Sequence, residues 1–394
     1  MNQRQQPLLV QGREQRQPIQ LFSLALALLL ISFALAQTPH TSPDTNEQLK
    51  TEIGQMLLIG FRGATVATNP AIIKTIRECR LGGVVLSDYD VPSRTFGRNI
   101  ISPSQLRKLT ADLQKLAPTP LFIAVDVEGG QINRLKPKHG FKDFPSHQAL
   151  GRLNDVEKTY ATAVEIAKEL RALGINWNYA PVVDLNLNPA NPIIGGRQRA
   201  FSADPALVAK MAGAFVRAHR TQNVISVLKH FPGHGSSQGD THRGLQDVTT
   251  TWRDSELDPY RELNRAGLID AIMTAHVTHI KIDPEYPATL SPKFLNDLLR
   301  VKIGFKGVII TDDLGMGAIT QNYGLADALI RAVNAGADIL LLANNSPQPY
   351  DADLPARAAR ILADAVGDGR IRAARIHESY QRIMELKQRF HIMP

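Results

Sequence analysis

The segment that determines the fold is VISVLKHFPGHGSSQGDTH, residues 224–242. Its first five residues form a short apolar run of the kind that becomes a buried strand. The following 14 residues contain three histidines, a lysine and an aspartate, separated by glycines and serines. Groups that can carry out chemistry therefore begin where a strand ends and continue into a glycine-rich loop. In barrels of alternating strands and helices, active sites form at that position.

Outward from this segment, short apolar runs alternate with longer amphipathic segments from about residue 50 onward. The apolar runs cover residues 56–61, 82–86, 120–125, 175–183, 224–228, 271–274, 307–310 and 338–342. Helix-like segments include residues 155–173, 205–222, 252–266 and 325–335, and the last helices are expected within 352–388. Eight strands, each followed by a helix, predict an α/β protein with a single (β/α)8 TIM-type barrel. A doubly wound open sheet is the alternative, but GFRG at residues 60–63 is a poor nucleotide-binding loop.

The N-terminal residues 1–36 have the pattern of an export signal. Arg4, Arg13 and Arg16 precede an uncharged stretch, residues 21–36, that ends in Ala-Leu-Ala before Gln37. This stretch has 16 residues, slightly fewer than the roughly 20 of a membrane-spanning helix. We expect a cleaved signal peptide, with an uncleaved membrane anchor as the alternative, and hence a periplasmic or secreted protein. Residues 37–48 are expected to be a disordered spacer and residues 49–394 one catalytic domain.

Composition excludes several classes of protein. The net charge is +8, which favours an anionic polymer as surroundings or substrate, but the basic residues are scattered. Without a basic stripe and interleaved aromatic residues, nucleic-acid binding is not expected.

Cys79 is the single cysteine, so no intrachain disulfide can form, and we expect a passive thiol at a helix end. We expect a monomer.

Polar residues follow five successive predicted strands. They are Asp126 and Glu128 after the third strand, Asp184 after the fourth, Lys229 and His230 after the fifth, His276 after the sixth, and Asp312 and Asp313 after the seventh. An acid directly after a strand is often a helix N-cap, and this alternative stays open for Asp184 and Asp313. Because these strand ends meet on one face of a barrel, together they predict a polar pocket for a neutral, hydroxyl-rich ligand.

The histidines of residues 229–242 could act in two ways. A zinc site of His230, His234 and His242 is disfavoured because a glycine-rich loop fixes metal geometry badly and the helical HExxH pattern is missing. Asp240 can instead orient the imidazole of His242 and raise its pKa for general acid work. Asp312 would then be the nucleophile. The adjacent Asp313 should point away from the same cleft, because side chains alternate along a strand.

The residues KHFPGHG (229–235) and DTH (240–242) resemble the signature of the β-N-acetylhexosaminidase branch of glycoside hydrolase family 3. Further matching segments follow the family order: DVEGGQINR (126–134), GINWNYAPVVD (174–184), NPIIGGRQRAFSADP (191–205), MTAHV (273–277) and TDDLGM (311–316). The resemblance implies a retaining exo-β-N-acetylglucosaminidase without a metal or other cofactor. Asp312 matches the family nucleophile, and His242, supported by Asp240, matches its acid/base. Family sugar contacts correspond to Asp126, Arg134, Arg199, Lys229 and His230, with Met316 beside the pocket.

The chain departs from the family pattern at a few positions. Val127 and Gln131 stand where the family often has DQEGGR, and Ser236-Ser237 stands where it often has Asp-Thr. Arg197 remains an alternative to Arg199 as the sugar contact.

The expected substrates are peptidoglycan fragments or chitooligosaccharides. A phosphorylase is an alternative, because a histidine acid/base does not repel phosphate. A non-catalytic glycan-binding protein, a β-glucosidase and a metal-dependent amidohydrolase fit the residues less well.

Overall fold

The computed structural model describes residues 43–393. The predicted signal peptide or anchor, residues 1–36, lies outside this range. Helix α2 (Pro43–Gln55) includes residues 43–48, so the prediction of a disordered spacer is wrong for that part. From Glu47 onward the chain forms one compact unit, to which all that follows refers. Within the described residues, every helix is too short or too polar to cross a bilayer.

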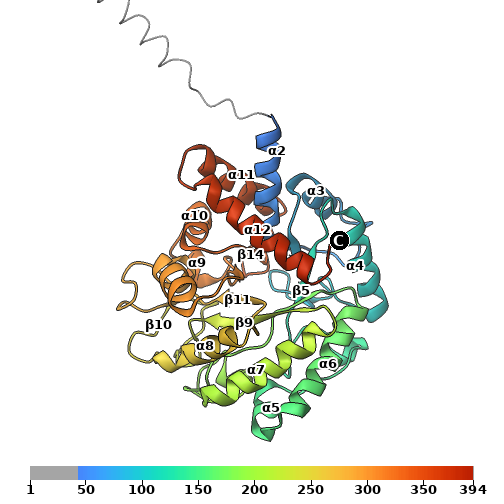
Figure 1. Ribbon diagram of the computed structural model, residues 1–394. Coiled ribbons are helices and arrows are strands. Elements are labelled where there is room, and N and C mark those ends of the chain that lie inside the picture. Colours follow the sequence, from blue (N-terminus) through green and yellow to red (C-terminus); the bar gives the residue numbers. More distant parts are fainter. Residues whose placement is uncertain (1–42, 394) are drawn as a thin grey trace, which may run out of the picture. The chain divides into compact units, whose positions relative to one another are not determined.

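Eight parallel strands form the centre of this unit (Figure 1). They are β1 (Leu57–Gly60), β2 (Gly83–Val85), β5 (Phe122–Val125), β8 (Trp177–Asn178), β9 (Ile225–Phe231), β11 (Ala271–Thr274), β13 (Val308–Ile310) and β14 (Leu340–Leu342). Their order is β13-β11-β9-β8-β5-β2-β1-β14. A parallel bridge between Ile310 and Ile339 brings the two outer strands together, which closes the sheet into a barrel. The predicted TIM-type barrel is confirmed, and each of the eight apolar runs overlaps one strand. The strand β9 extends beyond its predicted run, residues 224–228, and includes Lys229 and His230.

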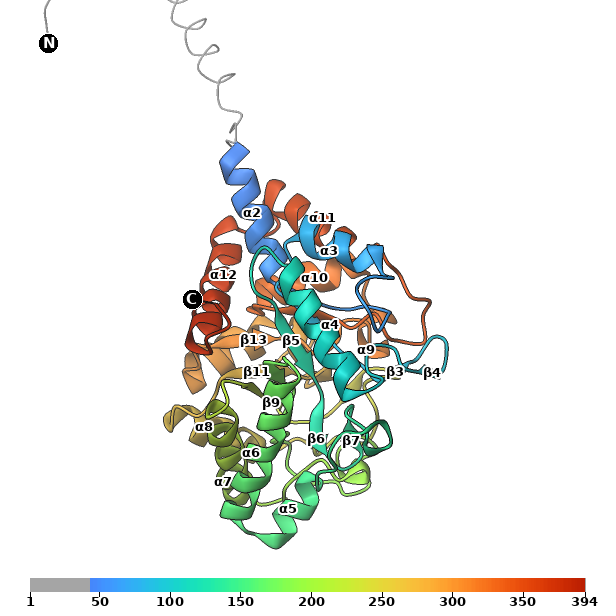
Figure 2. The same ribbon diagram turned by 90° about the vertical axis from the view of Figure 1, so that its right-hand side faces the viewer.

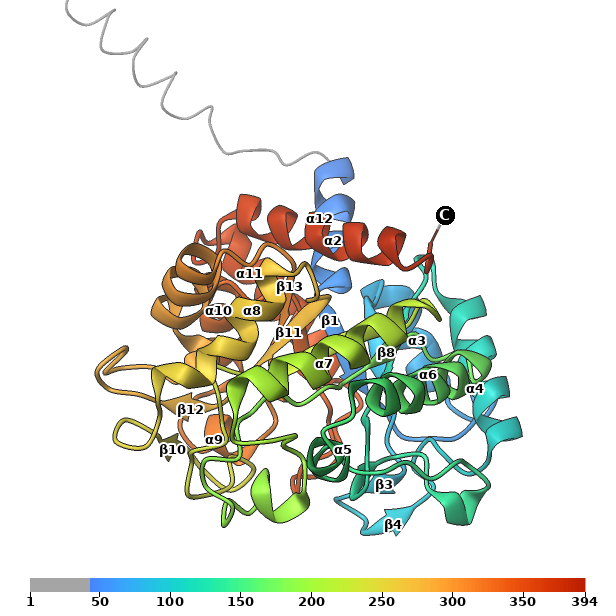
Figure 3. The same ribbon diagram turned by 60° about the horizontal axis from the view of Figure 1, so that its bottom comes forward.

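Helices surround the strands in all three ribbon views (Figures 1–3). They are α3 (Pro70–Cys79), α4 (Pro103–Leu116), α5 (His147–Leu153), α6 (Val156–Ala172), α7 (Pro205–Arg220), α8 (Asp258–Arg265), the π-helix η5 (Lys293–Ile303), α9 (Gly317–Thr320), α10 (Leu325–Ala335), α11 (Leu354–Gly367) and α12 (Ala373–Arg389). The strands are buried on both faces, by helices outside and by neighbouring strands inside, which explains their continuous apolar sequences.

Local sequence signals set the helix starts. The Asp155 side chain accepts the backbone N–H of Lys158 and caps α6. Asp204 caps α7 in the same way, and Pro205 occupies its first turn, where a missing N–H costs nothing. Cys79 is buried as the last residue of α3, as expected.

Three short two-stranded ribbons extend the carboxyl ends of the barrel strands. They pair β3 (Tyr89–Asp90) with β4 (Thr95–Phe96), β6 (Val127–Gly129) with β7 (Ile132–Asn133), and β10 (Gln246–Asp247) with β12 (Val277–Thr278). Figure 3 shows β3, β4, β10, β12 and α9 at the end of the barrel that lies opposite α12. The loops at this end form the walls of the candidate site.

Candidate active site

A cavity of about 390 Å³ lies at the carboxyl ends of the barrel strands. All nine residues predicted for the site line it: Asp126, Arg134, Arg199, Lys229, His230, Asp240, His242, Asp312 and Met316. They come from the carboxyl ends of four barrel strands, β5, β8, β9 and β13, and from the loops that follow them. The barrel therefore assembles the site from segments far apart in the sequence.

A buried carboxylate, Glu128, holds two of the cationic side chains in place. Its two oxygens accept hydrogen bonds from Arg199 at 2.9 and 2.8 Å, and the ammonium of Lys229 lies 2.8 Å away. Lys229 also contacts Asp126 at 2.8 Å. Burial alone would raise the pKa of Glu128, but the charges of Arg199 and Lys229 outweigh burial and keep it below its ordinary value. The sequence places Glu128 among the polar residues of the predicted pocket but assigns it no catalytic or binding role.

Asp184 is also buried, and its carboxylate fixes the backbone after β9 rather than capping a helix. It accepts the backbone N–H of His234 at 2.7 Å and that of His230 at 3.3 Å. It also contacts Nδ1 of His230 at 2.7 Å. Because Nδ1 faces a carboxylate, it carries the proton, and Nε2 can accept from Arg199 at 3.3 Å. Asp184 therefore sets both the position and the tautomer of His230.

His242 and Asp240 form a dyad at the mouth of the cavity. Nδ1 of His242 lies 2.7 Å from Oδ1 of Asp240, which also accepts the backbone N–H of His242 at 2.9 Å. This hydrogen bond raises the pKa of His242. The side chain of His242 is 65% exposed, so its Nε2 is open to a ligand.

The loop that carries this dyad is attached to the start of α9. The backbone N–H of Gly317 donates to the carbonyl of His242, and that of Ala318 donates to the carbonyl of Thr241, both at 3.1 Å. A Cβ at Gly317 would lie 2.6 Å from the His242 carbonyl oxygen, so this close approach needs glycine. His234 is buried inside the loop and contacts the hydroxyls of Ser237 and Thr241.

Asp312 and Asp313 follow β13 and have different partners. Asp312 accepts the backbone N–H of Asp313 at 2.8 Å. Burial would raise its pKa, but the electrostatic influence of the neighbouring His276, His230 and His242 side chains outweighs burial and lowers it. The carboxylate of Asp313 instead accepts the backbone N–H groups of Gly315 and Ala343, and burial raises its pKa to about 6. Asp312 is thus the more acidic carboxyl group of the pair.

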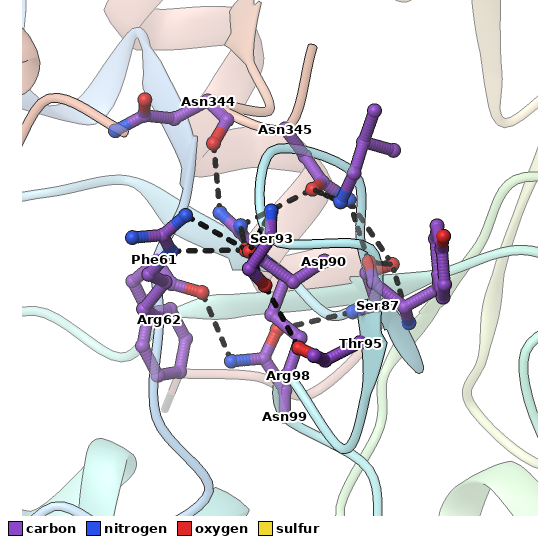
Figure 4. Close-up of polar contacts among 12 residues, drawn as sticks. Phe61, Arg62, Ser87, Asp90, Ser93, Thr95, Arg98, Asn99, Asn344 and Asn345 are labelled. Atoms are coloured by element: carbon purple, nitrogen blue, oxygen red, sulfur yellow. Dashed lines mark hydrogen bonds and ion pairs between the residues drawn. The ribbon is translucent and has the colours of Figure 1, made fainter. Parts of the chain in front are cut away.

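A network of polar contacts around Asp90 supports another part of the cavity wall (Figure 4). Asp90 forms ion pairs with Arg62 and with the buried Arg98. Arg98 donates to the side chain of Asn345 at 3.2 Å and to the carbonyl of Asn344 at 2.9 Å. Since Arg62, Arg98 and Asn345 belong to the loops after β1, β2 and β14, the network joins three loops into one wall. Arg98 and Asn345 line the cavity directly.

The two arginines that the sequence offered for one role are in different environments. Arg199 is 8% exposed and engaged by Glu128, whereas Arg197 is exposed at the rim of the cavity. Arg134 lies 3.7 Å from Asp126 and 3.9 Å from Asp88. Met316 is buried and contributes an apolar surface to the cavity beside Asp312.

The site thus combines three chemical functions. Asp312 offers an ionised carboxylate, the Asp240–His242 dyad offers a proton on an accessible imidazole, and the cluster around Lys229 offers charged hydrogen-bonding groups. A ligand with many hydroxyl groups could be held by the cluster while the other two groups act on one bond.

Comparison with known proteins gives a consistent result. The model of the glycosyl hydrolase family 3 N terminal domain matches residues 48–386. Beta-hexosaminidase A of Pseudoalteromonas piscicida is 33% identical over 382 residues, which cover 88% of this chain and 61% of that protein. Beta-hexosaminidase of Stenotrophomonas maltophilia (strain K279a) is 36% identical, covering 79% of this chain and 89% of that protein.

Solved structures agree with the sequence relatives. The structure of a glycoside hydrolase family 3 beta-N-acetylglucosaminidase from Paenibacillus sp. str. FPU-7 superimposes with a TM-score of 0.79 at 38% identity. The match covers 87% of this chain and 63% of that one. The chain therefore spans less than two thirds of the Pseudoalteromonas and Paenibacillus proteins.

Proposed function

The chain belongs to glycoside hydrolase family 3, and we propose that it is a retaining exo-β-N-acetylglucosaminidase. It would hydrolyse terminal β-linked N-acetylglucosamine through a covalent glycosyl-enzyme intermediate. The main support for this proposal is that Asp312, whose pKa is lowered, and the Asp240–His242 dyad line the same cavity.

In the first step, the carboxylate of Asp312 attacks the anomeric carbon while the bond to the leaving oxygen breaks. His242 donates its proton to that oxygen. The environment favours the protonation state that this step needs in both groups, since the pKa of Asp312 is lowered and that of His242 is raised. Using an imidazole instead of a second carboxylate as acid avoids repulsion between two negative charges.

In the second step, the neutral imidazole of His242 takes a proton from water. The resulting hydroxide-like oxygen attacks the anomeric carbon, and the carboxylate of Asp312 leaves. Two successive displacements at one carbon return the sugar with its original β configuration. Asp240 does not touch the reacting atoms, but its hydrogen bond at 2.7 Å holds the imidazole in place through both steps.

The remaining polar groups would bind the sugar. We assign hydroxyl contacts to Asp126, Arg134, Lys229, Arg199 and His230, with Met316 against an apolar part of the ring. Arg199 is preferred to Arg197 because it lies in the buried cluster with Lys229 and His230. A side chain fixed in this way loses little conformational freedom when it binds a hydroxyl group.

The biological substrate is proposed from the leader and the family. If residues 1–36 direct export, the protein would act in the periplasm or outside the cell. We propose that it acts as a monomer. It would touch the membrane only where the leader stays uncleaved. Peptidoglycan fragments and chitooligosaccharides are the substrates that this location favours.

The test is hydrolysis of an aryl N-acetyl-β-glucosaminide by the full-length protein in phosphate-free buffer. Asp312→Ala and the corresponding aryl β-glucoside serve as controls. Turnover of the N-acetyl sugar, lost in Asp312→Ala with an unchanged circular dichroism spectrum, would support the proposal. Turnover that requires added phosphate, or that persists in Asp312→Ala, would refute it.

A further inference from the structure

We propose that Arg197 and Arg243 form a subsite for the leaving group that selects an anionic group, of the carboxylate class. This inference rests on the proposed function. It starts from a second cavity, of about 400 Å³, beside the main one. Its walls include Arg197, Asp240, Arg243 and Gln246.

The second cavity adjoins the proposed active site. Arg197 and Asp240 line both cavities. Asp240 is also the hydrogen-bond partner of His242, the proposed acid. The acid must lie within hydrogen-bond reach of the oxygen that joins the sugar to its leaving group. The leaving group therefore begins beside His242, and the second cavity is the adjoining space.

The charge in this cavity is positive and available. Among residues 46–393, the side chains of Arg197 and Arg243 take part in no ion pair or hydrogen bond, and both are exposed. Arg199, two residues from Arg197, is by contrast buried and paired with Glu128. The one carboxylate of the cavity, Asp240, uses Oδ1 for two hydrogen bonds to His242. Two arginines thus line a space whose walls contain only one carboxylate, and Oδ1 of that carboxylate is already engaged.

Both arginines extend from backbone that is held in place. The N–H of Arg243 donates to the carbonyl of Asp240 at 3.0 Å, and its carbonyl accepts from the Gln321 side chain at 2.9 Å. Arg197 ends a short 3₁₀ turn (Gly195–Arg197) that is closed by the N–H of Gln198. A guanidinium on fixed backbone presents a planar pair of N–H groups, which matches a carboxylate in two parallel hydrogen bonds.

The sharpest test compares two ligands that differ only in charge. The 3-carboxyphenyl and 3-carbamoylphenyl 1-thio-β-N-acetylglucosaminides have the same size and are not cleaved, so calorimetry on the full-length protein measures binding alone. We expect the carboxylate to bind about 5–10-fold more tightly, the range for one or two charge-assisted hydrogen bonds at a partly exposed site. High salt should reduce this ratio, because exposed charges are screened.

Substitutions of the two arginines test whether they cause the preference for the carboxylate ligand. In Arg197→Gln/Arg243→Gln the binding ratio should fall to about 1, and in Arg243→Lys it should fall only in part. Arg265→Gln, which removes an equal charge from an exposed position of α8, should leave the ratio unchanged. A wild-type ratio near 1, or a ratio that survives in the double variant, would overturn the inference.

The O-linked forms of the same two ligands separate this inference from the proposed function. Cleavage of both, with the carboxylate preferred, supports both proposals. Selective binding of the thioglycosides without cleavage of either O-glycoside would refute the hydrolase and leave the anionic subsite supported. Binding of neither thioglycoside would overturn both.

Discussion

Glu128→Gln should destabilise the protein strongly, although Glu128 does not contact the proposed reacting atoms. The carboxylate makes two hydrogen bonds with Arg199 and one ion pair with Lys229. Glutamine has the same shape but no charge, and it turns an N–H group toward one of these cations. Lys229 keeps Asp126 as a partner, whereas Arg199 loses its buried counter-charge. Removing one partner of a buried ion pair costs about 3–5 kcal/mol.

Thermal unfolding followed by circular dichroism measures this loss. Roughly 350 folded residues have an unfolding entropy of about 0.7 kcal/mol/K, so Tm should fall by about 4–7 °C. Glu262→Gln is the matched control. It removes the same charge from an exposed position of α8, and its Tm should change by less than about 1 °C. A Tm of Glu128→Gln equal to that of the control would show that the buried pair does not hold the site together.

Four further results are expected. His242→Ala should lower kcat/KM by about 10²–10⁴ on substrates with poor leaving groups and far less on activated aryl glycosides; equal losses on both would contradict its role as acid. In the wild type, kcat/KM should fall as pH rises through the raised pKa of His242. Asp240→Asn weakens the hydrogen bond between Asp240 and His242, so in this variant the fall should begin at lower pH. A pH profile that is the same in both proteins would count against the dyad. Asp184→Asn should raise KM more than it lowers kcat, because it frees His230 in the sugar-binding cluster; unchanged steady-state kinetics would refute this. Since the proposed steps use only carboxylate and imidazole, EDTA should not change the rate; a rate lost in EDTA and restored by a metal would contradict the mechanism.

The barrel could be predicted because its strands are covered on both faces. Such strands are continuous apolar runs, and all eight runs in the sequence overlap a strand of the sheet. The positions of Asp312, Lys229 and His230 could be predicted for a related reason. Each lies at or just beyond the end of a strand, where the barrel requires side chains to meet.

Pairing between distant residues could not be predicted. Glu128 is hydrogen-bonded to Arg199, which lies 71 positions later in the chain. Arg98 is hydrogen-bonded to Asn345, which lies 247 positions later. Only the closed barrel brings such residues together, and nothing local distinguishes Glu128 from any acid after a strand. For the same reason the sequence leaves a helix cap open for Asp184, although this carboxylate accepts the N–H groups of His230 in the next strand and of His234 just beyond it.

The sequence does not reveal that the first helix of the described chain begins within residues 37–48. Residues 37–48 are polar and contain two prolines, which is typical of a disordered spacer. Pro43 instead occupies the first position of α2, where proline is well accommodated because its missing N–H would have no partner there.

The central claim is that Asp312 is the nucleophile of a double displacement. The most direct measurement is trapping with 5-fluoro-N-acetyl-β-glucosaminyl fluoride, followed by peptide mass spectrometry of the full-length protein. We expect one fluoroglycosyl group per chain, attached to the peptide that contains Asp312 and absent in Asp312→Ala. A label on another residue, or hydrolysis that releases the α-configured sugar without any label, would contradict it.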